Sequence, residues 1–97
     1  MYDKPMGYTM EFDFDPVKAT INEHKHGVSF VHAEQALHDD RAVTVEDPDA
    51  EGEQRQITLG MDALGRVIVV VYTLRGERVR ILSARKASPG EARNYHA

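Results

Sequence analysis

The chain has 97 residues, of which 41% are hydrophobic and 29% are charged, and its formal net charge is −4. This length fits one domain, and the composition is typical of a globular chain rather than a disordered one. The absence of cysteine excludes disulfides and thiolate metal sites, and the longest apolar run, residues 67–72, is too short to cross a bilayer. No charged-then-apolar leader opens the sequence, so we expect a cytoplasmic protein.

The first part of the chain predicts an extension, a strand and a helix. Residues 1–9 show no periodicity and contain Pro5 and Gly7, so we expect an N-terminal extension followed by a single domain over residues 10–97. Residues 10–14 alternate apolar and acidic side chains, as a half-buried strand does.

A helix is expected from Asp15-Pro16 to about His26. The Asp15 carboxylate can cap the first amides, and proline at the first helical position gives up no needed donor. Gly27 suits the left-handed residue that ends a helix. Within the helix, the spacing of Val17, Ile21 and His24 predicts a thin apolar seam toward the core.

The rest of the chain predicts a short helix, four strands and a final helix. Ser29 can cap a helix that runs to about Leu37 with Phe30, Ala33, Ala36 and Leu37 inward. Strands are expected over residues 42–46, 55–60, 66–74 and 78–85, the third of them central because it is apolar on both faces. Ser88, Pro89 and Glu91 form a capping box for the last helix. The short connections make the four strands an antiparallel meander, so the fold class is α+β.

The charge is unevenly distributed along the chain. Residues 1–53 hold four basic against thirteen acidic residues, a net charge of −9, whereas residues 54–97 hold eight basic against three acidic ones, a net charge of +5. Such asymmetry points to a polyanionic partner, and arginine, which makes up seven of those eight, suits phosphate. The structural alternative is a solvated arginine-rich sheet face that pairs with the acidic half.

Three groups of residues could carry chemistry. Lys25 and His26 lie in the last turn of the first helix, where the helix dipole stabilises positively charged side chains. Alternatively, Lys25 could contact a phosphate and His26 could carry a proton. Arg55 and Arg66 lie at the starts of adjacent strands. They either keep the strand edges solvated or contact phosphate. Strict alternation along the last strand puts Arg80 and Arg85 on opposite faces unless a bulge intervenes. The five histidines lack metal-ligand spacing, and no nucleotide-binding loop is present, so neither a metal nor another cofactor is expected.

The chain resembles the BrnT toxin family over nearly all of residues 10–95. The resemblance rests on three groups of residues in order: Phe12-Asp13-Phe14-Asp15-Pro16, Lys18, Asn22 and Lys25-His26-Gly27-Val28-Ser29-Phe30; Gly52-Glu53-x-Arg55, Gly60, Gly65-Arg66 and Thr73; and Arg80-Ile81-Leu82-Ser83-Ala84-Arg85-Lys86-Ala87, Glu91 and Tyr95. Phe14 stands where many members of the family carry tryptophan, which changes packing.

The resemblance implies a bacterial type II toxin with a RelE-like α+β fold and ribonuclease activity that arrests translation. It also implies a BrnA-type ribbon-helix-helix antitoxin, binding to operator DNA only through that antitoxin, and a two-fold heteromeric complex. With the basic clustering, it leads us to expect His26, Arg80 and Arg85 as catalytic residues. Substrate contacts are expected from Lys25, Arg55, Arg66, Lys86 and Tyr95.

Two other functions remain open on the sequence. The acidic net charge is compatible with a non-catalytic corepressor that acts only through its DNA-binding partner. A sheet-face protein-binding domain unrelated to RNA is the third hypothesis, and it predicts no salt-dependent affinity for RNA.

Overall fold

A computed structural model describes residues 11–97, so the expected N-terminal extension and Met10 of the first expected strand lie outside the described residues. The elements in chain order are β1 (Glu11–Asp13), α1 (Pro16–His26), α2 (Phe30–Leu37), β2 (Val43–Glu46), β3 (Arg55–Met61), β4 (Val67–Arg75), β5 (Arg78–Lys86) and α3 (Pro89–His96). No helix among these is long and apolar enough to span a bilayer.

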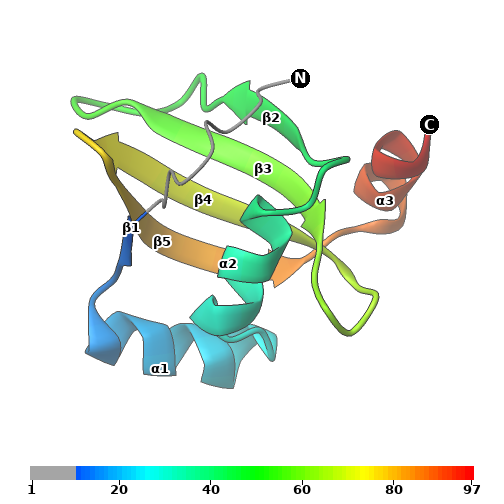
Figure 1. Ribbon diagram of the computed structural model, residues 1–97, viewed down its shortest axis with the longest axis horizontal. Coiled ribbons are helices and arrows are strands. Elements are labelled where there is room, and N and C mark those ends of the chain that lie inside the picture. The colour runs from blue at the N-terminus through cyan, green and yellow to red at the C-terminus, as the bar shows by residue number, and fades with distance from the viewer. Residues whose placement is uncertain (1–10) are drawn as a thin grey trace.

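The five strands form one sheet in the order β1-β5-β4-β3-β2. Strands β2 to β5 form an antiparallel meander with β4 in the middle of the sheet, as predicted, and β1 adds to β5 in parallel. Helix α2 crosses one face of the sheet, and α1 lies along the β5 side (Figure 1). The predicted α+β class is therefore confirmed.

Local capping explains where each helix begins and ends. The Asp15 carboxylate accepts hydrogen bonds from the first amides of α1, and Gly27 ends that helix at a φ of 71°. Ser29 caps α2, and Ser88 and Glu91 form the capping box of α3. These short-range signals are readable in sequence because the capping group lies within three residues of its partner.

The core lies between α2 and the sheet. Phe30, Ala33 and Ala36 of α2 are buried against β4 and β5, which contribute chiefly Ile68, Val70 and Ile81. The predicted inward face of α2 is thus confirmed. The end of α2 comes so close to β3 that a Cβ on Gly60 would lie 2.2 Å from the Ala36 carbonyl oxygen.

The predicted apolar seam of α1 is wrong. Val17 and Ile21 are 68% and 59% exposed, and the buried residue of the helix is Asn22. Its amide nitrogen donates to the carbonyls of Val28 (3.1 Å) and Ala84 (2.8 Å), and its amide oxygen accepts from the Ala84 N–H (3.1 Å). The Asn22 amide satisfies the backbone of β5 as a neighbouring strand would, so its hydrogen bonds, together with the packing of Ala19 against the core, hold α1 in place.

A β-bulge interrupts β5. Val71 of β4 pairs with Ser83 and Tyr72 pairs with Ile81, which leaves Leu82 as the extra residue. The bulge corrects the expectation of strict alternation, because Ile81 and Ala84 now share the core face although they lie three residues apart. The residues just outside them, Arg80 and Arg85, consequently lie together on the opposite face.

Candidate functional site

Arginines from β3 and β5 meet on the sheet face opposite α2. Arg55 pairs across the sheet with Thr73, and Thr73 pairs on its other side with Arg80. Arg85 is opposite Val69, which lies on the same face of β4 as Thr73. The structure therefore brings three of the predicted phosphate contacts, from two strands, to one surface.

Each of these arginines also contacts a carboxylate. The ion pairs on this face and its borders are Arg55–Asp47 (3.0 Å), Arg75–Glu53 (3.0 Å), Arg78–Glu11 (3.1 Å), Arg80–Asp13 (3.3 Å) and Arg85–Glu91 (2.8 Å). Four of the five carboxylates come from the acidic first half, so the structural alternative for the charge asymmetry holds in part. Partly exposed pairs contribute only about 0–1 kcal/mol, so an incoming phosphate can compete for these guanidinium groups.

A groove between α1 and the β5 bulge collects the groups predicted at the helix end. It has a volume of about 260 Å³ and is lined by Lys18, Ile21, Asn22, Lys25, His26, Leu82 and Ser83. Lys25 is exposed and His26 is half-buried, and neither forms an ion pair within residues 11–97. The groove therefore offers unpaired cations beside an imidazole.

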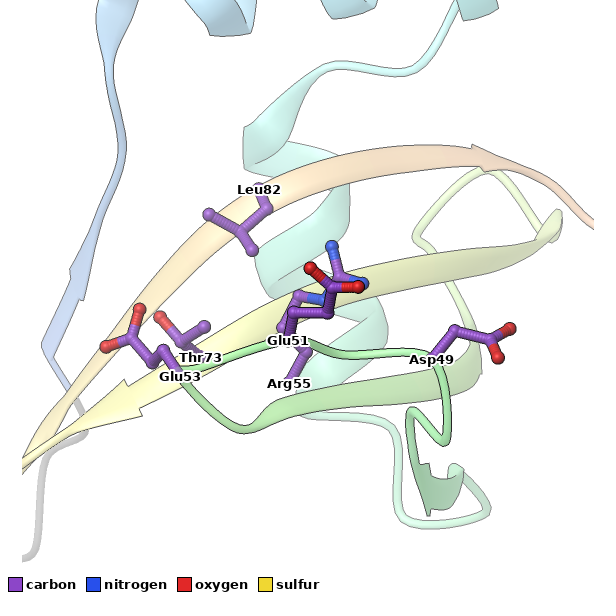
Figure 2. A pocket seen from close by; sticks show the side chains of 6 residues that line it. All are labelled: Asp49, Glu51, Glu53, Arg55, Thr73 and Leu82. Atoms are coloured by element: carbon purple, nitrogen blue, oxygen red, sulfur yellow. The ribbon is translucent and has the colours of Figure 1, made fainter.

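A second hollow, of about 380 Å³, lies on the far side of Leu82. It is lined by Asp49, Glu51, Glu53, Arg55, Thr73 and Leu82. Figure 2 shows the 47–54 loop crossing in front of the sheet while α2 lies behind it, so the hollow is on the arginine face. Leu82 lines both the groove and the hollow, so the two spaces adjoin at the bulge.

Arg66 and Tyr95 are held by contacts with other parts of the fold. Arg66 forms an ion pair with buried Asp62 (2.8 Å) and donates to the Gly27 carbonyl (3.1 Å), so it fixes the turn after α1. Tyr95 is buried and donates a hydrogen bond to Asp39. Burial, together with that bond to the carboxylate, raises the pKa of the Tyr95 phenol to about 12. Neither side chain lines the groove or the hollow, and their substrate contacts stay predictions.

Arg85 has a structural role as well as a place on the arginine face. Its guanidinium donates to both carboxylate oxygens of Glu91, at 2.8 and 2.9 Å, which ties α3 to the end of β5. This Arg85 contact, followed by the Ser88 amide, lowers the pKa of Glu91 to about 2. Lys86 lies exposed at the end of β5 and lines neither the groove nor the hollow.

The sequence reasoning missed Thr73, Leu82, Ser83 and the structural role of Asn22. Thr73 is 1% exposed and lies between two arginines, but within an apolar strand it reads as an ordinary β-branched residue. The β5 bulge, which places Leu82 and Ser83, has no proline or glycine to mark it. The available signal for the bulge was that strict alternation along β5 places the apolar residues Ile81 and Ala84 on opposite faces of the sheet.

Comparisons with known proteins agree on one family. A family model described as "Ribonuclease toxin, BrnT, of type II toxin-antitoxin system" matches residues 14–91. The structure is similar to the crystal structure of the Brucella abortus ribonuclease toxin BrnT, with a TM-score of 0.61 and 26% identity over 82% of this chain and 99% of that one. No curated protein matches the chain.

Proposed function

Because this chain belongs to the BrnT family of ribonuclease toxins of type II toxin–antitoxin systems, we propose that it cleaves RNA without a metal ion and thereby inhibits translation in the cytoplasm. The observation that carries the proposal is the groove at the β5 bulge, where Lys25 and His26 adjoin the arginine face. The reaction is assigned to side chains of this groove and of the arginine face beside it.

The proposed reaction is an internal transfer at phosphorus. The ribose 2′-oxygen forms a bond to the adjacent phosphorus, the bond to the 5′-oxygen breaks, and the products are a 2′,3′-cyclic phosphate and a 5′-hydroxyl. His26 carries the proton between the 2′-hydroxyl and the leaving 5′-oxygen. Lys25, Arg80 and Arg85 neutralise the phosphorane oxygens, and each well-placed donor contributes on the order of 10²–10³ in rate.

Paired histidine variants test this assignment. RNA incubated with the purified protein in excess EDTA should yield cyclic-phosphate ends, and His26→Ala should lower the cleavage rate at least 100-fold. His24→Ala is the matched control, because His24 is exposed on the same helix turn and lines a different surface hollow with Thr20 and Glu23. Equal loss in both variants, or cleavage that stops on chelation alone, would refute the proposed mechanism.

Neutralisation by an antitoxin is the second half of the proposal. We expect a BrnA-like ribbon-helix-helix protein to bind this chain in a two-fold heteromeric complex, and to bring it to operator DNA. Expression of the chain alone should arrest growth and deplete RNA, and co-expression with the antitoxin should restore growth. Growth arrest that the antitoxin leaves unchanged would remove the partner from the proposal.

A non-catalytic corepressor is the second candidate, and the ion pairs favour it. Every arginine named on the sheet face already has a carboxylate partner, as in a surface built for stability. This candidate predicts that the complex with the antitoxin binds operator DNA while expression of the chain alone has no effect on growth or RNA.

A further inference from the structure

Two residues that line the 380 Å³ hollow, Arg55 and Thr73, each carry a buried polar atom without a hydrogen-bond partner in the described part of the chain. Thr73 is 1% exposed, and its Oγ1 hydrogen bonds with no group in the described part of the chain. The Nε atom of Arg55, on the neighbouring strand, is also buried and unpartnered, although the same guanidinium pairs with Asp47 through another nitrogen. Buried polar atoms are normally satisfied, so both side chains keep hydrogen-bonding capacity that a ligand in the hollow can use when they turn toward it.

The carboxylates around the hollow restrict the chemistry of that ligand. Asp49, Glu51 and Glu53 line it, and Glu53 is occupied by Arg75 at 3.0 Å on both carboxylate oxygens. Glu51 forms no ion pair within residues 11–97, and in Figure 2 its side chain projects over the middle of the hollow whereas Asp49 points outward. The acidic lining disfavours a phosphate inside the hollow, and its mixture of carboxylate, guanidinium and hydroxyl groups suits a neutral group with both donors and acceptors.

We propose that this hollow binds a guanine base of single-stranded RNA. An ionised carboxylate accepts two hydrogen bonds at once, and among the four RNA bases guanine alone has two adjacent N–H donors, on N1 and N2. Its O6 and N7 atoms are the acceptors that arginine recognises. Glu51 therefore accepts from the N1 and N2 groups, Arg55 and Thr73 supply the remaining polar contacts, and Leu82 packs against the ring.

The position of the hollow connects base binding to cleavage. Leu82 is the shared wall between the hollow and the groove of Lys25 and His26. A strand with guanine in the hollow thus continues directly into the groove, which makes the hollow a specificity site for the cleavage proposed above. The inference rests on that proposed function for the identity of the strand, but base binding itself needs no cleavage.

Nucleoside binding to the purified 97-residue chain tests the base preference directly. Titration calorimetry should show guanosine binding about tenfold or more tightly than adenosine, cytidine or uridine. Inosine, which lacks only the N2 amino group, should lose a similar factor. An uncleavable 2′-O-methyl oligonucleotide with one central guanine should bind more tightly than guanosine monophosphate, since the groove adds contacts only for a continuing strand.

Three variants assign the contacts. Glu51→Gln should abolish the discrimination between guanosine and inosine, whereas Glu46→Gln, which removes an exposed carboxylate of β2 outside the hollow, should leave it unchanged. Thr73→Val should weaken guanosine binding without lowering the melting temperature, because the hydroxyl it removes has no partner among residues 11–97.

The outcomes separate this inference from the ribonuclease proposal. Equal affinity for all four nucleosides, or unchanged discrimination in Glu51→Gln, would overturn the guanine site even if the protein cuts RNA. Affinity for guanosine monophosphate equal to that for the oligonucleotide would overturn the assignment to an RNA strand. Guanosine-selective binding by a protein that leaves RNA intact would support the site and refute only the nuclease.

Discussion

Removal of the Asn22 side chain should cost about 3 kcal/mol of stability. The residue is 7% exposed and makes three hydrogen bonds, to Val28 and to both backbone groups of Ala84, and these join α1 to the edge of β5. A buried hydrogen bond contributes about 1 kcal/mol net, and the groups left behind in Asn22→Ala have no water to replace it. With stabilities of about 5–15 kcal/mol typical of small domains, the variant should fold but unfold more readily.

Urea unfolding followed by far-UV circular dichroism measures this loss. A loss of about 3 kcal/mol lowers the urea midpoint by roughly 1–3 M at the usual m-values of about 1–3 kcal/mol per M. Glu23→Ala, an exposed neighbour on the same helix, is the control and should change stability by less than about 0.5 kcal/mol. A loss below about 1 kcal/mol in Asn22→Ala would show that the apolar contacts of α1, rather than this amide, hold the helix.

Asn22→Asp distinguishes hydrogen bonding from shape. The carboxylate keeps the size of the amide and can still accept from the Ala84 N–H, but it places its other oxygen against two carbonyls that need a donor. We expect a loss at neutral pH at least as large as that of Asn22→Ala. Burial against two carbonyls raises the folded-state pKa of the new carboxyl above its ordinary value of about 3.9, so part of the loss should return as the pH falls to about 4 and protonation restores one donor. A variant as stable as the parent at pH 7 would contradict the reasoning.

Two further substitutions probe other close contacts. Gly60→Ala should destabilise the protein by about 3 kcal/mol or more, because the new Cβ would lie 2.2 Å from the Ala36 carbonyl oxygen. The control is Gly90→Ala, whose Cβ meets only the end of a flexible side chain and should change the melting temperature little. Equal melting temperatures for the two variants would disprove the clash. Glu91→Gln should lose about 1 kcal/mol at pH 7, a modest figure because this glutamate and Arg85 are both partly solvent-exposed. The folded-state pKa of Glu91 is lowered from 4.5 to about 2, so the stability difference between Glu91→Gln and the parent should be present above pH 4.5 and disappear as the pH falls to 2. A stability difference that persists at pH 2 would mean that charge pairing is not its source.

The helices and the meander could be predicted from the sequence because their signals are local. Asp15, Ser29 and Ser88 cap helices whose first amides lie two or three residues away, and Gly27 ends α1 through its own backbone conformation. The alternation of β3 and the two-sided apolar character of β4 likewise depend only on neighbouring residues. The same local reasoning placed Lys25 and His26 at the end of α1, so this part of the candidate site was accessible from the sequence.

Long-range pairing decided the rest. The bulge at Leu82 arises because Ile81 and Ala84 must both reach the core opposite β4, and only this pairing brings Arg80 and Arg85 to one face. The partner of each charged group, such as Glu91 for Arg85, is chosen by distance in the folded chain, which no spacing in the sequence encodes. Residue type and periodicity thus specify secondary structure and the residues near its ends, whereas the contacts between distant segments determine which of these residues share a surface.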